Sequence, residues 1–546
     1  MGLKVVIIGA VAAGPKAGCR LKRVLPKAQV VMVDRDECFS YGGCGIPYYV
    51  SGDVTDLEGL RSTSFHMLRD VKFFKGSKGI DVLAGWEALN IDRQAKEVLV
   101  REIKTGNQKR LGYDKLVLAT GSRPHLPPLD GLDLAGVMPV ANLHQAKAIK
   151  DAVAQGQVSR AAVVGSGPTG LEMAEALADL WGVEVILLEM ADQVLPGLLE
   201  ADLARFVENH LKEQGIELRL GAKVEGFIGQ EGRIKGIRFN GQEREVDLAL
   251  LATGVRPDID LAVQAGLETS PLGGLVVNDR LQTSDPDIFA GGDCVVNRCL
   301  ISGGETYLSS GSVANRQGRV IGTNLAGGQA RFPGVVGSWI MKVFELNAAK
   351  VGLTAAAAKK AGFDPVSALV VQTDRAHFYP TRELMYLKMV ADRTSRRVLG
   401  LQGVAPTGDA LSARIDALAA LLPAKPTVED VSNLELAYAP PFASAMDVLN
   451  AAANALDNAL DGRLRDIGPE EFSRLLNQPD GQTVFLDIRT MTDARPYLEA
   501  LADRGWIHLP QETLADRLAK LPRGKDLVLI CKSGARSYEA QVTLTE

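Results

Sequence analysis

Short apolar runs separated by amphipathic stretches dominate the first part of the chain, and they predict buried parallel strands joined by helices. The run at residues 5–8 is followed by a glycine turn at residues 9–14, which opens a predicted helix to about residue 25. A second apolar strand, residues 29–33, ends at Asp34. This order is typical of a dinucleotide-binding unit, in which the pyrophosphate lies on the helix N-terminus and the carboxylate binds a ribose hydroxyl.

The first turn matches the three-glycine dinucleotide fingerprint only in part, because Val11 occupies the place of the middle glycine. Taken alone, an ordinary strand-to-helix turn is an equal alternative for this stretch. The residues expected to face the dinucleotide are Gly9, Val11, Ala12, Ala13, Gly14 and Asp34.

The same unit recurs in complete form later in the chain. An apolar strand at residues 161–164 leads into a three-glycine turn, a predicted helix reaches about Trp181, and a strand at residues 183–188 ends at Glu189. A carboxylate at this strand end accepts hydrogen bonds from a ribose 2′-hydroxyl and repels a 2′-phosphate. We therefore expect NADH at the second unit, with NADPH as the alternative if a basic residue lies nearby. The glycines of this turn are Gly165, Gly167 and Gly170.

Two similar closing motifs follow the two units, at residues 118–124 and 251–257. Two dinucleotide sites in one chain predict a tightly held flavin and a diffusible nicotinamide, because one hydride carrier must meet another. Asp293 ends a further predicted strand, where its carboxylate is expected to meet a ribityl or phosphate-linked hydroxyl; an ordinary acidic turn is the alternative. The candidate cofactor contacts in the closing motifs are Thr120, Gly121 and Gly254.

The stretch from Phe39 to Tyr49 holds the candidate nucleophile, Cys44, among three glycines. The turn signals predict a loop that feeds a helix, whose N-terminal amides would favour a thiolate able to attack disulfides. A small buried side chain is the alternative for a lone cysteine.

With these motifs, residues 1–450 resemble the pyridine nucleotide-disulfide oxidoreductase family. The Cys44 loop is similar to that of the coenzyme A-disulfide reductase and NADH-dependent persulfide reductase branch. The resemblance implies FAD at the first unit, NADH at the second, and reduction of a mixed disulfide or persulfide at Cys44. It also implies that Cys38 is structural, because relatives with a redox pair have four residues between their cysteines and this chain has five. Gly43 replaces the asparagine common in this branch and, with Ser40, is expected beside the substrate.

Coenzyme A, as substrate or bound ligand, needs cationic partners for its phosphates. Arg20, Lys22 and Arg23 lie on the first predicted helix and are candidates for this role; solvated helix charges are an equal alternative.

The region after about residue 326 resembles the dimerisation domain of the family, and alternation at residues 338–344 and 384–390 predicts an antiparallel sheet. The resemblance implies a homodimer in which Tyr379 and Tyr438 reach the thiol site of the second subunit. A phenol can donate a hydrogen bond to a developing thiolate. An interface or core aromatic is the alternative for each tyrosine.

A predicted helix from residue 443 to about 460 precedes a separate C-terminal unit. Its strand at residues 526–530 runs into Cys531 and a short loop that resembles the cysteine loop of a rhodanese domain, in which amides stabilise a thiolate or persulfide. We expect Cys531 to handle sulfane sulfur. Residues 497–510 lack the usual rhodanese pattern and the chain stops soon after the loop, so the domain is expected to be either short or truncated.

Composition narrows the class of protein further. The 546 residues carry a net charge of -5, which argues against general binding of nucleic acid or an anionic membrane. Six scattered cysteines and the lack of a long apolar run predict a cytoplasmic protein without a disulfide framework or a membrane span, and no metal site is predicted.

The predicted fold is therefore α/β, with two Rossmann-like dinucleotide-binding domains, an α+β dimerisation domain and a C-terminal α/β rhodanese-like domain. The expected bounds are 1–145 with 271–325 for FAD, 146–270 for NAD(H), 326–455 for dimerisation and 462–546 for the rhodanese-like domain.

The predicted activity is FAD-dependent, NADH-driven reduction of coenzyme A persulfide, polysulfide or coenzyme A disulfide at Cys44, with a small-molecule thiol or persulfide as the partner. One alternative is an NADH oxidase or peroxidase in which Cys44 cycles through a sulfenic acid. Another is a flavin-based redox sensor or sulfur carrier.

Overall fold

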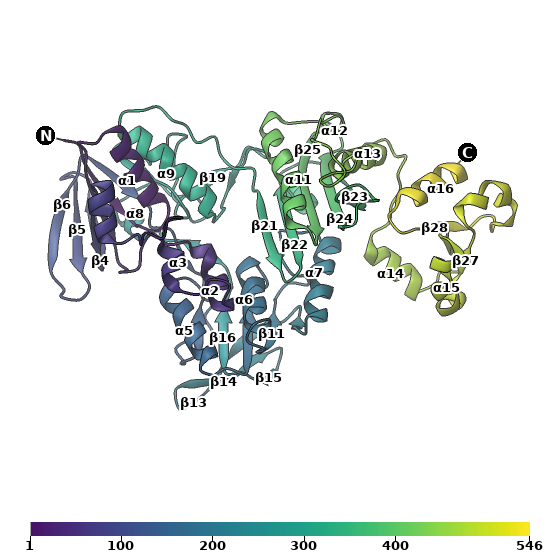
Figure 1. Ribbon diagram of the computed structural model, residues 1–546, viewed down its shortest axis with the longest axis horizontal. Coiled ribbons are helices and arrows are strands. Elements are labelled where there is room, and N and C mark those ends of the chain that lie inside the picture. Colours follow the sequence, from purple (N-terminus) through teal and green to yellow (C-terminus); the bar gives the residue numbers. More distant parts are fainter. Residues whose placement is uncertain (1, 546) are drawn as a thin grey trace. The chain divides into compact units, whose positions relative to one another are not determined.

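The computed structural model describes residues 2–545, and their contacts divide the chain into two compact units (Figure 1). The first unit comprises Met1–Pro196 and Glu208–Val335, and the second comprises Gly197–Val207 and Val336–Glu546.

The first unit contains a five-stranded parallel sheet in the order β18-β7-β1-β2-β3. Helices α1 (Ala13–Val24) and α9 (Gly311–Leu325) pack against each other beside it. Two glycines of α9 allow this contact: a Cβ on Gly318 would lie 2.5 Å from the Ala13 carbonyl oxygen. The strands are β1 (Lys4–Ile8), β2 (Gln29–Asp34), β3 (Asp81–Ala84), β7 (Lys115–Leu118) and β18 (Ile288–Ala290).

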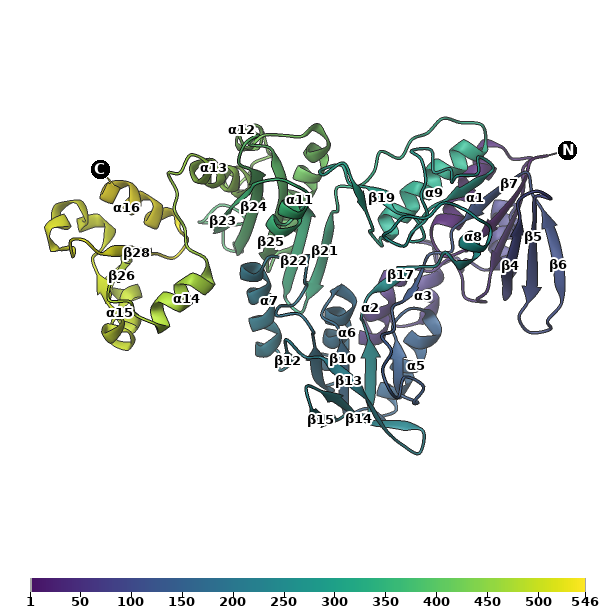
Figure 2. The ribbon, with the colours of Figure 1, turned by 180° about the vertical axis from the view of Figure 1, so that it is seen from behind.

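A three-stranded antiparallel sheet belongs to the same part of the chain, and its strands lie side by side in Figure 2. They are β4 (Trp86–Asp92), β5 (Glu97–Glu102) and β6 (Gln108–Gly112).

The second dinucleotide unit repeats the parallel arrangement, in the order β12-β11-β10-β16-β9. Helix α6 (Pro168–Ala178) ends three residues before the predicted Trp181, since a turn follows it. The sheet strands are β9 (Val137–Pro139), β10 (Arg160–Val164), β11 (Glu184–Leu188), β12 (Glu217–Arg219) and β16 (Leu248–Leu251), joined by α5 (Leu143–Ala154) and the antiparallel β13 (Val224–Gln230), β14 (Arg233–Phe239) and β15 (Gln242–Glu245).

The predicted antiparallel sheet of the second unit is present, in the order β21-β22-β25-β24-β23. The helix predicted from residue 443 begins only at Val448, because the Asp447 carboxylate accepts the Leu449 N–H and caps it there. The elements are β21 (Trp339–Val343), β22 (Leu346–Gly352), β23 (Pro365–Thr373), β24 (Leu384–Asp392), β25 (Val398–Ala405), α10 (Ala355–Lys360), α11 (Gly408–Leu421), α12 (Val428–Ser432) and α13 (Val448–Leu460).

The C-terminal part is a small α/β structure with a parallel three-stranded sheet in the order β27-β26-β28. Phe472, Phe485 and Trp506 form an aromatic core on one side of it. Its elements are β26 (Thr483–Asp487), β27 (Trp506–His508), β28 (Asp526–Ile530), α14 (Pro469–Asn477), α15 (Met491–Ala500) and α16 (Ala535–Thr545). The structure thus has the predicted α/β character throughout.

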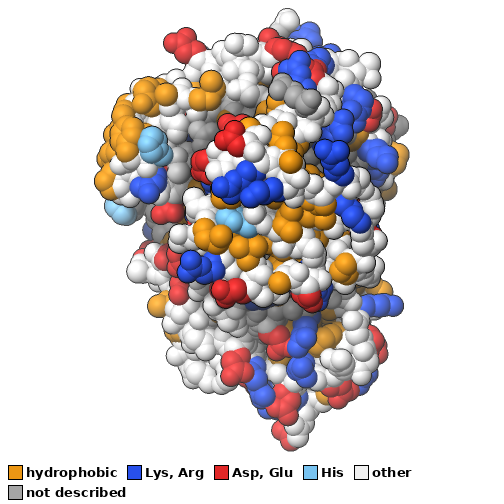
Figure 3. Space-filling view, turned by 90° about the vertical axis from the view of Figure 1, so that its right-hand side faces the viewer, with side chains coloured by type: hydrophobic (Ala, Val, Ile, Leu, Met, Phe, Trp, Pro, Cys, Tyr) orange, Lys and Arg blue, Asp and Glu red, His pale blue; other side chains and the backbone are white. Residues whose placement is uncertain are grey.

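Two features of the described residues match the sequence analysis: side chains of both charges on the surface, and the length and composition of the helices. Figure 3 shows basic, acidic and apolar side chains interspersed on the face it presents. None of the helices within residues 2–545 has both the length and the apolar character needed to span a bilayer.

Candidate active site

The two glycine turns have the same geometry. Gly9 and Gly165 have φ of 98° and 101°, and a Cβ on either would lie within 2.4 Å of a carbonyl oxygen in the neighbouring loop. The closing glycines Gly14 and Gly170 are equally tight, since a Cβ would lie 2.0 and 1.9 Å from the carbonyl oxygen of the first glycine. Both turns therefore need glycine for the chain to pack, as the dinucleotide-binding fold requires.

The middle position of each turn is open, which is what a pyrophosphate needs. A Cβ on Gly167 would have no atom within 4 Å. Val11 stands at the corresponding place in the first turn and is 38 % exposed, so its side chain does not close the turn. Beside it, Ala12 is half-buried and Ala13 is buried. The residues present thus fit two dinucleotides.

The acidic residues at the ends of β2 and β11 bind the turns themselves. Asp34 accepts the Ala10 N–H at 2.7 Å, and Glu189 accepts the Ser166 N–H at 2.8 Å and the Ser166 hydroxyl at 2.7 Å. A carboxylate has about four acceptor positions, so both retain capacity for a ribose hydroxyl. Residues 189–193 contain no Lys or Arg, which favours NADH over NADPH at the second dinucleotide unit.

The closing motifs join the two dinucleotide units through β8 (Ser122–Pro124) and β17 (Val255–Pro257), which pair antiparallel. The Thr120 hydroxyl donates to the Asp258 carbonyl oxygen at 2.5 Å, so its side chain serves this connection. Gly121 and Gly254 have positive φ and open space where a Cβ would be.

Asp293 lies in the turn after β18, and its carboxylate accepts the Ser122 hydroxyl at 3.1 Å and, at 3.2 Å, the N–H of Ser310, the residue that caps α9. The preceding turn is fixed by Gln317, a fully buried side chain whose Oε1 accepts the Gly292 N–H at 2.7 Å. Gln317 lies on α9, so this helix holds the turn that carries Asp293.

Cys44 lies in a 3₁₀ turn (Gly43–Gly45) that runs directly into α2 (Ile46–Ser51). The residue is exposed. Its loop is tied to the first dinucleotide turn, because the N–H of the buried Ser40 donates to the Ala10 carbonyl oxygen at 2.8 Å. Cys38 is a free, half-buried thiol, and its backbone N–H donates to Asp36 Oδ1.

The prediction that helix amides favour a Cys44 thiolate is wrong, because the surrounding protein groups raise the pKa of this thiol. Partial enclosure of the thiol, followed by the charges of Glu172 and Asp293, raises the pKa of Cys44 above its usual value. The helix after the cysteine has six residues, and its amides do not offset these effects. These two carboxyl groups come from different dinucleotide units, so Cys44 lies within electrostatic reach of both.

Glu172 on α6 is a site residue that sequence reasoning missed. Burial, and then the charge of Glu175, raise the pKa of Glu172 to about 7, although the Tyr48 hydroxyl lowers it in part. Tyr48 lies on α2, which packs against α6. The available signal was a glutamate two residues after the last glycine of the second fingerprint.

The candidate phosphate ligands on α1 divide into two kinds. The Lys22 ammonium donates to the carbonyl oxygens of Pro26 and Ala28, so it stabilises the turn after α1, and the expectation that it faces a ligand is wrong. Arg20 donates through Nε to the Thr323 hydroxyl at 3.0 Å and is half-buried. Arg23 is exposed at the end of the helix.

The two candidate tyrosines lie in the second unit, on loops of residues 374–383 and 433–447. Tyr379 is half-buried and Tyr438 is 52 % exposed. The loops touch each other, since the Ala376 N–H donates to the Pro440 carbonyl oxygen at 3.3 Å.

Cys531 follows β28 and has the electrostatics expected of the resemblance. The Gly534 N–H donates to its sulfur at 3.0 Å. Burial opposes ionisation, but the Ser537 hydroxyl and the amides of Ser537, Ser533 and Gly534 outweigh it, so the pKa of Cys531 is lowered. The two candidate thiols therefore have pKa shifts of opposite direction.

Comparison with known proteins gives matches to family models, to relatives and to solved structures. A family model described as pyridine nucleotide-disulphide oxidoreductase matches residues 3–318, and a model of the dimerisation domain of these enzymes matches residues 340–449. The chain is 35 % identical to the CoA-dependent NAD(P)H sulfur oxidoreductase of Pyrococcus furiosus, over 83 % of this chain and 99 % of the relative. It is 33 % identical to the NADH oxidase of Methanocaldococcus jannaschii, over 83 % and 98 %.

Among solved structures, the NAD-dependent persulfide reductase from A. fulgidus matches with a TM-score of 0.93 and 38 % identity, over 100 % of this chain and 97 % of that one. These matches confirm the predicted fold class, including its C-terminal part. The chain therefore belongs to the pyridine nucleotide-disulphide oxidoreductase family.

Proposed function

We propose that the protein is an FAD-dependent reductase that uses NADH to reduce coenzyme A persulfide, polysulfide or coenzyme A disulfide at Cys44. The observation that carries the proposal is the position of this thiol. It is exposed, its loop is hydrogen-bonded to the first dinucleotide turn, and carboxyl groups of both dinucleotide units act on it. A sulfur bound there would be close to the cofactor sites of both units.

The residues that would hold the cofactors are those of the two turns, strand ends and closing motifs. Bound there, the nicotinamide and flavin supply two electrons for cleavage of a sulfur–sulfur bond. For FAD they are Gly9, Val11, Ala12, Ala13, Gly14, Asp34, Thr120, Gly121 and Asp293; for NADH they are Gly165, Gly167, Gly170, Glu189 and Gly254.

The overall reaction converts a coenzyme A persulfide, NADH and one proton into coenzyme A, hydrogen sulfide and NAD⁺. Cys44 must lose its proton to attack the sulfur, and a departing thiolate must gain one. Glu172, with a pKa of about 7, is about half protonated near neutral pH. In its protonated form it can donate a proton and does not oppose a Cys44 thiolate, whereas its ionised form raises the pKa of Cys44. We assign Glu172 to the handling of this proton.

Substrate binding would involve both the thiol loop and α1. Arg20 keeps guanidinium N–H groups beyond the one bound to Thr323, and Arg23 is exposed, so both can serve the coenzyme A phosphates. Ser40 and Gly43 flank the thiol. Tyr379 and Tyr438 would reach the thiol site of the second subunit in a homodimer and donate hydrogen bonds to the leaving sulfur.

The C-terminal domain would accept or present sulfane sulfur on Cys531, whose pKa is lowered. The proposed domains are residues 1–145 with 271–325 for FAD, 146–270 for NADH, 326–455 for dimerisation and 462–546 for sulfur transfer. We place the activity in the cytoplasm.

The test is anaerobic NADH oxidation by the flavin-loaded protein with each of the three sulfur substrates, alongside Cys44→Ser. Turnover that requires Cys44 supports the proposal. The second candidate is NADH oxidase activity, which the similarity to the Methanocaldococcus jannaschii protein favours. Turnover with oxygen or peroxide, and with none of the sulfur substrates, would establish that function instead.

A further inference from the structure

The loops that carry the two tyrosines are joined by a polar network. We call residues 374–383 the Tyr379 loop and residues 433–447 the Tyr438 loop. Neither contains a helix or strand, so side-chain and backbone hydrogen bonds must fix their relative position. The contacts that join them or their flanking strand are Ala376 N–H to Pro440 O at 3.3 Å, Ser444 Oγ to Arg375 O at 3.0 Å and Gln372 Nε2 to Met446 O at 2.8 Å.

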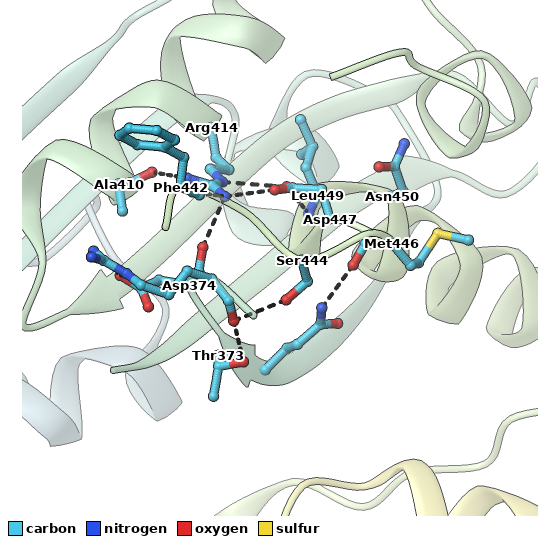
Figure 4. A network of polar contacts seen from close by, with 12 residues as sticks. Thr373, Asp374, Ala410, Arg414, Phe442, Ser444, Met446, Asp447, Leu449 and Asn450 are labelled. Carbon is cyan, nitrogen blue, oxygen red and sulfur yellow. Dashed lines mark hydrogen bonds and ion pairs between the residues drawn. The ribbon is translucent and has the colours of Figure 1, made fainter. Parts of the chain in front are cut away.

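Arg414 of α11 contacts both loops, as Figure 4 shows. Its Nη2 donates to the Asp374 carbonyl oxygen at 3.0 Å in the Tyr379 loop. The same nitrogen donates to the Phe442 carbonyl oxygen at 3.4 Å and to Asp447 Oδ2 at 2.6 Å in the Tyr438 loop. A single guanidinium group therefore contacts both loops.

The network is buried, which makes its geometry strongly determined. Arg414 is 6 % exposed and Asp447 is 3 % exposed. Their ion pair is bidentate, because Arg414 Nε also donates to Asp447 Oδ1. A buried charge without a partner is costly, so the arginine has few alternative positions. Its planar fork has five donors, whereas a lysine ammonium cannot reach the same set of acceptors in fixed directions.

The base of each loop is fixed by the residues that Arg414 holds. The Asp447 carboxylate also accepts the Leu449 N–H and caps α13, where the Tyr438 loop ends. Asp374 is fully buried, and its carboxylate accepts the Glu383 N–H at 3.0 Å and the Thr407 hydroxyl at 2.9 Å, which closes the Tyr379 loop.

We infer that Arg414 is a positioning residue that sets the spacing between the Tyr379 and Tyr438 loops, so that both phenols are presented together to the thiol site. The inference rests on the proposed function of the two tyrosines. Arg414 itself is 6 % exposed and acts through the loop backbones that it binds.

The test compares Arg414→Met and Arg414→Lys with a matched control. Lys388→Met removes another largely buried ion pair of the same compact unit, formed with Glu200 and Asp202 at 2.6 and 2.7 Å. Lys388 lies in β24, outside both loops. Each flavin-loaded protein is followed anaerobically in two separate steps: reduction by NADH, and reoxidation by coenzyme A persulfide.

We expect Arg414→Met to slow reoxidation by about 100-fold, the scale of effect seen when a reacting group is displaced by about 1 Å, without changing the rate of reduction by NADH. Lys388→Met should change neither rate. Arg414→Lys keeps the charge beside Asp447 and should give an intermediate reoxidation rate, which provides the test if Arg414→Met does not fold. A folded, dimeric Arg414→Met or Arg414→Lys with the reoxidation rate of the wild type would overturn the inference.

A double-mutant cycle separates this inference from the proposed function. In a Tyr379→Phe/Tyr438→Phe background, Arg414→Met should slow reoxidation no further, because it acts through the phenols. A full additional loss in that background would show that Arg414 has a merely structural role. If the double tyrosine variant reoxidises like the wild type, the tyrosine assignment itself is wrong, whatever Arg414 does.

Discussion

Replacing Glu172 by glutamine tests the electrostatics of the thiol site. The protein raises the pKa of this carboxyl from 4.5 to about 7, mainly by burial. At about 1.4 kcal/mol for each pKa unit, the difference corresponds to about 3 kcal/mol. Because the folded pKa is the higher one, the folded protein binds the extra proton between pH 4.5 and 7, and its stability falls as the pH rises through that window.

Glu172→Gln removes this pH dependence, because an amide does not ionise. At pH 8 we expect the variant to exceed the wild type in unfolding free energy by up to about 3 kcal/mol, and at pH 4 to have no such advantage. Thermal or urea unfolding of the flavin-loaded protein at both pH values measures the difference. Equal differences at the two pH values would refute the reasoning.

The same substitution should change the pH profile of catalysis. In the wild type, reoxidation by coenzyme A persulfide should decline above about pH 7 as Glu172 loses its proton. Glu172→Gln should be slower at pH 6 and lack this decline, and its Cys44 should ionise at lower pH because one repelling charge is gone. A variant that retains the decline would exclude Glu172 as its source.

Glu175→Gln is the matched control, since it removes the same charge from the same helix. The Glu175 charge raises the pKa of Glu172, so its removal should shift the decline to lower pH without abolishing it.

Three further predictions concern other parts of the chain. Because the pKa of Cys531 is lowered and that of Cys44 raised, iodoacetamide at pH 7 should modify Cys531 first, as followed by peptide mass spectrometry; the reverse order would contradict the electrostatics. Glu189→Gln should raise KM for NADH by about 10-fold with little change in kcat, since hydrogen bonds to a charged group contribute about 1.5–3 kcal/mol; an unchanged KM in steady-state assays would remove Glu189 from the site. Gly318→Ala should destabilise the protein by about 1–3 kcal/mol and speed flavin release, because the new Cβ would lie 2.5 Å from the Ala13 carbonyl oxygen; Gly311→Ala, on the same helix with open space, should do neither in thermal unfolding and flavin-fluorescence assays.

Local signals in the sequence were sufficient for the dinucleotide units. The glycines of both turns and the acidic residues Asp34 and Glu189 occur at fixed spacing, because the strand, turn and helix they form are contiguous. The antiparallel sheet and the Cys531 loop were likewise predicted, since alternation and a seven-residue loop are short-range patterns.

Features that depend on tertiary contacts were not predictable in the same way. Glu172 acts on Cys44 only because α6 packs against α2. The raised pKa of Cys44 reflects its partial burial first, and then carboxyl groups far away in sequence. Lys22 lies on the predicted first helix, where the sequence suggests a ligand-binding cation. The chain turns back after α1, however, and the Lys22 ammonium donates to the carbonyl oxygens of Pro26 and Ala28 in that turn. The Arg414 network joins segments more than 25 residues apart, with no spacing that signals it.

Whether Cys44 carries the sulfur chemistry is tested by anaerobic NADH oxidation by the flavin-loaded protein with coenzyme A persulfide, comparing wild type with Cys44→Ser and Cys531→Ser. We predict rapid turnover in the wild type, its loss in Cys44→Ser while NADH still reduces the flavin, and retention of turnover in Cys531→Ser when the persulfide is supplied directly. Persulfide-dependent turnover that survives in Cys44→Ser would contradict the assignment of the sulfur chemistry to Cys44.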